Sequence, residues 1–284
     1  MTAMAEPSRF LPPLSPRDFR RIGGFVSEVS GIKLPPAKRA MVEGRLRRRV
    51  RGLGFADFSA YCRFVFDDGG LEQEAVHIID AVTTNKTEFF REPDHFRVLP
   101  GLALPHLAPP GRVRPVKLWS AACSNGAEPY TLAMVLAEYA GSHPGFDFAI
   151  AATDLCTEVL RTAALGIYPE AEIEPVPPAL RRRYLLRSRD RSRGKVRIAP
   201  ELRAKVRFLR LNLMDQTYGV KGPFDVIFCR NVLIYFDKPT QAAVVARLCD
   251  HLAPGGFLFL GHSETVAGFG MKLRPVAPTV FVKE

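Results

Sequence analysis

The sequence lacks the features that mark secreted, membrane-spanning and metal-binding proteins. No apolar run approaches the roughly 20 residues that a membrane-spanning helix needs, so we expect no membrane insertion. The N-terminal stretch MTAMAEPSRFLPPLSP has no basic region followed by an apolar one, which predicts no signal peptide. The 6 histidines form no H-E-x-x-H motif and the 5 cysteines form no C-x-x-C pair. We therefore expect no metal site and a reducing, cytoplasmic location.

Residues 116–137 contain neither of two common nucleotide-binding motifs. This segment begins as an apolar run, passes through small residues to Gly126, and continues with Tyr130, Ala133 and Met134 at helical spacing. A strand, a tight turn and a helix form the first unit of a doubly wound α/β sheet, which binds ligands beyond the carboxyl ends of its strands. The turn matches neither G-x-G-x-x-G nor G-x-x-x-x-G-K-[ST], so it resembles neither a dinucleotide site nor a P-loop.

Two acidic residues lie near this expected binding edge. Asp154 follows the apolar run at residues 148–153, and an acid at this place in a doubly wound sheet commonly binds ribose hydroxyls. Glu128 supports two interpretations about equally. Its carboxylate suits a ligand that carries an ammonium or sulfonium group, or it merely occupies the first turn of a helix, where the macrodipole favours anions.

The hydrophobic periodicity predicts an all-α domain followed by an α/β domain. The expected divisions are a helical bundle at residues 1–83, a segment and linker at 84–115, and the α/β domain at 116–284. The first part of the middle division is either an active-site segment or an ordinary connection between domains. Within the second division, the proline-rich residues 99–115 are expected to be the linker. A small antiparallel β insert is expected at residues 169–205, where the α/β alternation breaks.

Individual elements follow from the same patterns. Helices are predicted at residues 16–30, 37–52, 57–66, 71–82 and 240–252, and strands at 116–119, 148–153, 206–211, 224–229 and 257–261, with a final antiparallel pair at 273 and 279–282. In the fourth helix, Val76, Ile79 and Val82 are expected to face inward. The insert is expected to expose a strand edge near residues 196–198.

The net charge of +11 is concentrated in two runs. Residues 38–51 carry a net charge of +6, and residues 181–197 carry +8. Such runs bind nucleic acid, anionic lipid or an acidic protein surface, or they form a solvated face. For a single run, the solvated face is the favoured interpretation.

Five segments, in order along the chain, together resemble one known family. They are residues 85–92 (NKTEFFRE), 119–130 (WSAACSNGAEPY), 152–154 (ATD), 228–236 (FCRNVLIYF) and 261–264 (GHSE). They resemble the CheR family of chemotaxis receptor methyltransferases, which methylate glutamate side chains, and the resemblance covers nearly the whole chain. One departure is Ala127, where the family often has a second glutamate, but Glu128 is kept and we expect no loss of binding. The resemblance implies a Rossmann-like methyltransferase domain with a small antiparallel β insert, preceded by an all-α N-terminal domain.

The resemblance also implies roles for individual residues. Arg91 and Tyr235 match positions that face the methyl group and the incoming glutamate. The alternative for Tyr235 is a half-buried aromatic ring whose hydroxyl bonds to the backbone. Arg45, Arg48 and Arg49 are expected to bind the substrate. The positions that match the family's cofactor contacts are Asn85, Thr87, Arg91, Glu128, Asp154, Asn212, Leu213, Arg230 and Asn231.

The implied cofactor is S-adenosyl-L-methionine, with S-adenosyl-L-homocysteine as product. The implied partners are the cytoplasmic methylation helices of chemoreceptors and, at the β insert, a receptor C-terminal peptide. The protein is expected to be a monomer without a nucleic-acid partner. A nucleic-acid methyltransferase is the leading alternative because of the basic runs, but residues 229–232 (CRNV) lack the [DN]-P-P-[YFW] motif of amino-group DNA methylation. A cofactor-binding regulator without activity is a third possibility, and the presence of Arg91 and Tyr235 argues weakly against it.

Overall fold

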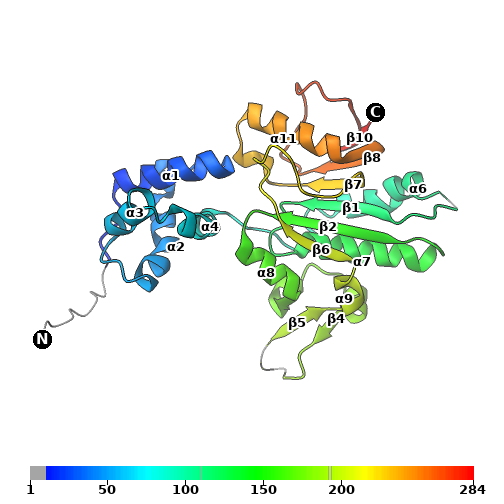
Figure 1. Ribbon diagram of the computed structural model, residues 1–284. Coiled ribbons are helices and arrows are strands. Elements are labelled where there is room, and N and C mark those ends of the chain that lie inside the picture. The colour runs from blue at the N-terminus through cyan, green and yellow to red at the C-terminus, as the bar shows by residue number, and fades with distance from the viewer. Residues whose placement is uncertain (1–10, 110, 191, 193) are drawn as a thin grey trace, which may run out of the picture. The chain divides into compact units, whose positions relative to one another are not determined.

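The computed structural model describes residues 11–109, 111–190, 192 and 194–284, which form two compact units (Figure 1). The first unit ends at Thr84, and the second spans Asn85–Glu284. Most of the stretch expected to lack a signal peptide, and Arg191 and Arg193 of the second basic run, lie outside the described residues. No helix in the described ranges is both long enough and apolar enough to cross a bilayer.

The first unit is a bundle whose helices begin and end where the sequence places caps. Its α-helices are α1 (Pro16–Ser30), α2 (Arg39–Gly52), α3 (Phe58–Phe66) and α4 (Leu71–Val82), with a 3-10 turn at Pro36–Lys38. Ser15 caps α1 by accepting a hydrogen bond from the backbone N–H of Asp18, and Gly31 ends the helix at φ 70°. Asp57 caps α3 in the same way through the N–H of Ala60.

The prediction for the inner face of α4 was partly wrong. Ile79 and Val82 are buried, but Val76 is only half-buried and Ile78 takes its expected place in the core. The buried stripe is rotated because Glu74 also points inward, where it binds Arg49 and Tyr61. A charged residue in the stripe is invisible to a pattern that counts only apolar side chains.

The second unit is built on a seven-stranded sheet with the order β6-β2-β1-β7-β8-β10-β9. The strands are β1 (Val116–Ala121), β2 (Phe148–Asp154), β6 (Val206–Arg210), β7 (Phe224–Cys229), β8 (Leu252–Leu260), β9 (Leu273–Ala277) and β10 (Val280–Lys283). The first five in spatial order pair in parallel, and β10 and β9 add antiparallel. The chain runs outward from β1 to β6 and then returns to β7 on the other side of β1. The switch point where such sheets bind ligands therefore lies between β1 and β7.

Helices cover the sheet on both faces. They include α7 (Ala127–Ser142), α8 (Thr157–Leu165) and α11 (Lys238–His251). The neighbouring β1 residues Leu118 and Trp119 belong to two separate core clusters, as expected for a strand whose side chains alternate between faces. Leu132 of α7 is in the first cluster and Leu248 of α11 is in the second.

Two segments of this unit differ from the prediction. The expected linker at 99–115 begins with helical turns, η2 (Leu99–Ala103) and α6 (Leu104–Leu107), which continue α5 (Asp94–Val98). Leu99, Ala103, Leu104 and Leu107 are buried, so this part belongs to the core in spite of its prolines. Strand β8 begins at Leu252, earlier than expected, because Pro254, Gly255 and Gly256 lie within a strand whose register shifts against β7.

The insert is a second, three-stranded antiparallel sheet, as expected, but its edge was predicted wrongly. Its strands β3 (Ile167–Pro169), β5 (Lys195–Ile198) and β4 (Leu185–Arg187) stand in this spatial order. Strand β5 is thus central and pairs on both sides, so residues 196–198 offer no free edge. The outer strands of this sheet are β3 and β4. The edge was predicted wrongly because β3, most of which precedes the expected insert, pairs with β5 on the side opposite β4. The insert also contains η3 (Glu170–Ile173), α9 (Pro178–Tyr184) and α10 (Pro200–Arg203).

Candidate functional site

Strained backbone gathers where the segment at 85–92 meets the carboxyl ends of β1 and β7. Within the described ranges, six non-glycine residues have positive φ, and five of them lie here: Phe90, Glu92, Ala122, Ser124 and Asn231. Each such residue costs of order 1–3 kcal/mol and persists only where the surroundings hold it. This concentration of strain marks the edge as the candidate site.

The Asp154 carboxylate, at the end of β2, holds the turn that follows β1. It accepts hydrogen bonds from the backbone N–H groups of Ser124 (2.8 Å) and Cys156 (2.9 Å). Gly126 follows with φ 93°, and an added Cβ there would lie 2.8 Å from Cβ of Ala163 and 2.9 Å from the hydroxyl of Tyr168. Only glycine therefore fits this position, because it lacks a Cβ and tolerates the left-handed backbone conformation.

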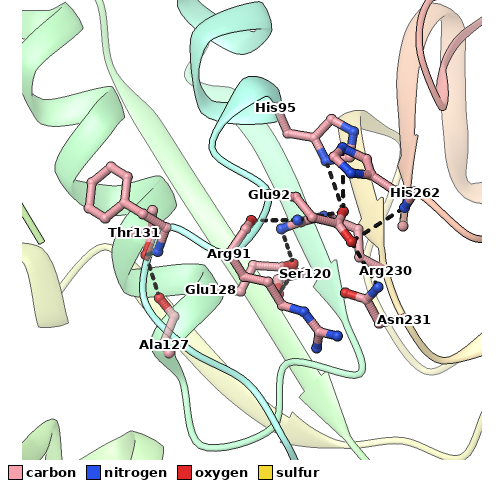
Figure 2. A network of polar contacts seen from close by, with 12 residues as sticks. Arg91, Glu92, His95, Ser120, Ala127, Glu128, Thr131, Arg230, Asn231 and His262 are labelled. Atoms are coloured by element: carbon pink, nitrogen blue, oxygen red, sulfur yellow. Dashed lines mark hydrogen bonds and ion pairs between the residues drawn. The ribbon is translucent and has the colours of Figure 1, made fainter. Parts of the chain in front are cut away.

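Arg230, at the end of β7, is the centre of a buried polar network (Figure 2). Its guanidinium donates to Glu128 through Nη1 (3.1 Å), and to Glu92 (2.8 Å) and the carbonyl of Arg91 (2.5 Å) through Nη2. Ser120 on β1 donates to the other oxygen of Glu128 at 2.7 Å. Arg230 thus joins its own segment to two others that are distant in sequence, residues 91–92 and the unit 120–128.

The two carboxylates respond differently to this arrangement. Burial raises the pKa of Glu92, but hydrogen bonds from Asn231 and Arg230 and the charge of Arg230 outweigh it and lower the pKa to about 2. Burial raises the pKa of Glu128, and Arg230 and Ser120 offset that effect only in part. With both groups ionised, two carboxylates face one guanidinium, and the excess negative charge suits a cationic ligand.

A further carboxylate, that of Glu264, holds the loop that follows Arg230. It accepts hydrogen bonds from the backbone N–H groups of Asn231 (3.0 Å), Val232 (2.9 Å), Leu233 (2.8 Å) and Gly261 (2.7 Å). The Asn231 side chain also donates to Glu92 at 3.0 Å. Glu264 thereby fixes the left-handed Asn231 and the start of the 3-10 turn Leu233–Tyr235.

Tyr235 and Arg91 have free donor groups at this site. Tyr235 is half-buried, and its hydroxyl makes no hydrogen bond within the described ranges, so it does not have the backbone partner that the alternative interpretation required. Arg91 is also half-buried and donates through Nη1 to the carbonyl of Lys86 at 3.0 Å. Both side chains therefore keep donors that can meet a carboxylate.

The other expected cofactor positions flank the same edge. The carbonyl of Asn85 accepts from Ser124 Oγ at 2.8 Å, and Thr87 is half-buried two residues later. Asn212, just beyond β6, accepts from the backbone N–H of Met214 at 3.0 Å, and Leu213 is buried beside it. Together with Glu128, Asp154, Arg230 and Asn231, they follow the strands on both sides of the switch point.

The three expected substrate-binding arginines lie on α2 in the first unit, in different surroundings. Arg49 makes a bidentate pair with the buried Glu74 (3.0 and 2.7 Å). Arg45 is exposed and donates to the carbonyls of Ala81 (3.3 Å) and Thr83 (2.7 Å) at the end of α4. Arg48 is exposed, with no ion pair in the part of the chain that the structure describes.

Sequence reasoning missed Glu92, Ser120 and Glu264. All three lie in segments that carry the family resemblance, 85–92, 119–130 and 261–264, which is the only signal that the sequence offers. A single acid or serine has no spacing pattern, and its partners become visible only when the fold brings four segments together.

Comparison with known proteins agrees with this geometry. Residues 85–282 match the family described as CheR methyltransferase, SAM binding domain, and residues 17–83 match the CheR methyltransferase all-alpha domain. The chain belongs to the CheR methyltransferase family. It is 43% identical over 266 residues to a chemotaxis protein methyltransferase of Klebsiella aerogenes (93% of this chain, 88% of the relative). It is 41% identical over 270 residues to the Escherichia coli protein of the same name (94% and 91%) and 40% identical over 266 residues to chemotaxis protein methyltransferase 2 of Pseudomonas aeruginosa (93% and 92%).

The family match makes S-adenosyl-L-methionine the cofactor of this methyltransferase. The residues at the switch point fit it. The turn at 122–126 carries only short side chains, Asp154 places a carboxylate at the end of β2, and the two carboxylates that share the guanidinium of Arg230 suit a sulfonium. Glu128 does lie in the first turn of helix α7, as the second interpretation has it. Its carboxylate accepts hydrogen bonds from Arg230 and Ser120.

Proposed function

We propose that the protein transfers the methyl group of S-adenosyl-L-methionine to glutamate side chains of chemoreceptors and so forms glutamate methyl esters. The observation that carries this proposal is the half-buried hydroxyl of Tyr235, which has no hydrogen-bond partner among the described residues and lies on the turn that Glu264 holds. The Tyr235 hydroxyl and the guanidinium of Arg91, whose Nη1 donates to the carbonyl of Lys86, are both donors that suit a carboxylate acceptor. The names of the relatives, chemotaxis protein methyltransferase, support chemoreceptors as the substrates.

The switch-point residues have separate tasks in this proposal. Asp154 would bind the ribose hydroxyls, and Asn212 and Leu213 would flank the adenine. Asn85, Thr87, Glu128, Arg230 and Asn231 would line the methionine end, which is where the buried network has its excess of negative charge. The residues share one rigid edge, which is what precise placement of a ligand requires.

The chemistry asks for orientation rather than proton transfer. The bound cofactor supplies an electrophilic methyl group on a sulfonium. A glutamate carboxylate has a pKa of about 4.3, so it is already a nucleophile at neutral pH and needs no general base. The Arg91 guanidinium and the Tyr235 hydroxyl would hold its oxygens in line for attack. Because opposite charges cancel on the way to a neutral ester, exclusion of water favours the reaction.

The basic face of α2 is proposed to bind the acidic methylation helices. Arg48 is the clearest candidate, because it is exposed and has no ion pair in the described ranges. Arg45 and Arg49 have partners inside the bundle, so a change at either also disturbs α4. Arg48 is therefore the residue on which to test substrate docking.

A receptor C-terminal peptide remains a proposed partner of the insert, at a different strand from the one expected. Strand β4 has a free edge, and Leu186 on it is 52% exposed. An added peptide strand would pair with this edge. A labelled-protein titration with receptor tail peptides should shift the signals of residues 185–187, and unchanged signals there would contradict the proposal.

Methyl transfer to receptor-containing membranes tests the main proposal. The protein is incubated with labelled cofactor and chemoreceptor membranes, and the product is treated with mild base. Release of the label as methanol shows a carboxyl ester and is the expected result. Label that stays in protein after base, or that enters nucleic acid, would contradict the proposal.

A further inference from the structure

Three potential metal ligands meet at the outer side of the network described above. Glu92, His95 and His262 each offer a ligand atom, and these atoms all lie within 4.8 Å of one another. Oε2 of Glu92 lies 3.7 Å from Nδ1 of His95 and 3.9 Å from Nε2 of His262. Figure 2 shows both imidazoles directed toward the Glu92 carboxylate.

His95 is an unusual member of this cluster, because one of its nitrogens has no partner. The side chain is 1% exposed, and Nδ1 makes no hydrogen bond. The other nitrogen, Nε2, lies 3.0 Å from Oγ1 of Thr279, which fixes the ring. A buried polar atom without a partner is rare in folded proteins and calls for an explanation, such as an ion.

We propose that Glu92, His95 and His262 form a site for a divalent transition metal ion such as Zn²⁺. Two imidazoles and one carboxylate are a ligand set that such ions use, with a fourth position left to water. The contact of His95 with Thr279 is the kind of outer hydrogen bond that orients a metal-binding histidine.

The observed spacing is close to what the ion requires. Ligand bonds of about 2.1 Å in a tetrahedron place neighbouring ligand atoms about 3.4 Å apart. The two nitrogen–oxygen distances exceed this by a few tenths of an ångström, and a small shift of the Glu92 carboxylate and of the exposed His262 would close the gap. On the outer side of the cluster, His95 and His262 line an open cavity of about 500 Å³, and His262 is 46% exposed.

The neighbouring charge selects the class of metal. Arg230 donates to the same Glu92 oxygen at 2.8 Å, so the carboxylate is already partly neutralised. Hard ions such as Mg²⁺ depend on carboxylates and should bind poorly, whereas Zn²⁺ gains from the two imidazoles. A bound ion would also compete with Arg230 for Glu92. We therefore expect the metal to slow methyl transfer, because Arg230 loses a partner that fixes it.

Calorimetric titration of the chelator-treated, full-length protein with Zn²⁺ tests the proposal. We expect one site with micromolar affinity, absorption bands of tetrahedral coordination when Co²⁺ replaces Zn²⁺, and no comparable binding of Mg²⁺. His262→Gln should weaken Zn²⁺ binding at least 10-fold, since it removes one of three protein ligands. His77→Gln changes an exposed histidine of α4 and should leave the affinity unchanged.

Equal Zn²⁺ affinity in wild-type protein and His262→Gln would overturn the proposal, and so would spectra without tetrahedral bands. Circular dichroism confirms that both variants fold. Methyl-transfer assays with and without Zn²⁺ extend the test, because inhibition should appear in wild-type protein and be at least 10-fold weaker in His262→Gln. Metal binding is measured without any substrate, so its failure leaves the proposed methyl transfer untouched.

Discussion

Two arginine–glutamate networks, one in each unit, show how a structural ion pair differs from one at a site. In the bundle, Glu74 accepts two hydrogen bonds from Arg49 and one from Tyr61, and all lie on regular helix. At the switch point, Arg230 is shared between Glu92 and Glu128, its Nε has no partner, and the backbone around it is strained. The first network is satisfied and closed. The second retains unmet polar groups and strain, which is what a ligand can use.

The largest difference between the two networks should appear when the arginine of each is replaced. Arg230→Gln leaves two buried carboxylates without their cation, and we expect a loss of about 3–5 kcal/mol in the free energy of unfolding together with loss of methyl transfer. Arg49→Gln should cost about 1–3 kcal/mol, because Arg49 is partly exposed, while the folded protein keeps its cofactor affinity. Denaturant unfolding and calorimetry measure both quantities. Equal effects of the two changes on activity per folded molecule would contradict the distinction.

The pH dependence of stability should reveal the second network through His95. Burial is the main cause that lowers the pKa of His95 to about 4, and the charge of Arg230 adds to it. A histidine in the unfolded chain has a pKa of about 6.5. The unfolded chain therefore binds the proton first, and stability should fall as pH drops from about 6.5 to about 4, by up to about 3 kcal/mol. Unfolding is measured with a chelator present. His95→Gln should flatten this part of the profile, and an unchanged profile in that variant would contradict the assignment.

Asp154→Ala should have a smaller effect, on the turn after β1 and on the cofactor that we propose for it. Its loss removes two hydrogen bonds that hold the turn and, in our proposal, the partner of the ribose hydroxyls. We expect cofactor binding to weaken by roughly 1–3 kcal/mol, the range for polar groups left unpaired. Calorimetry with S-adenosyl-L-homocysteine measures this. Unchanged affinity in a folded variant would remove Asp154 from the site.

The smallest expected effect concerns the bundle surface. Arg48→Glu should slow receptor methylation several-fold and leave cofactor affinity intact, because exposed charges steer association more than they hold a complex. Arg20→Glu makes the same charge change at an exposed position of α1 and serves as the control. If both variants slow methylation equally, net charge rather than the basic face of α2 is responsible.

The sequence predicts the regular parts of this protein better than the site. Periodicity and caps place the bundle helices and the parallel strands, because each depends on nearby residues. The place of β5 within its sheet was predicted wrongly, because the pairing partners of a strand come from other segments of the chain. Glu92 and Glu264 were missed for the same reason, because their partners come from another segment of the chain. The family resemblance names the positions around Arg230, but the sharing of that cation becomes visible only in the structure.

The central proposal, an oriented glutamate carboxylate, is tested most directly by Tyr235→Phe. The substitution removes one hydroxyl that has no hydrogen-bond partner in the described ranges, so the fold should be unaffected. We predict that kcat for receptor methylation falls on the order of 10- to 100-fold, because small misalignment of the attacking group is costly, while the Kd for the cofactor is nearly unchanged. Wild-type kcat in this variant would contradict the catalytic role of Tyr235 and show that its ring only packs.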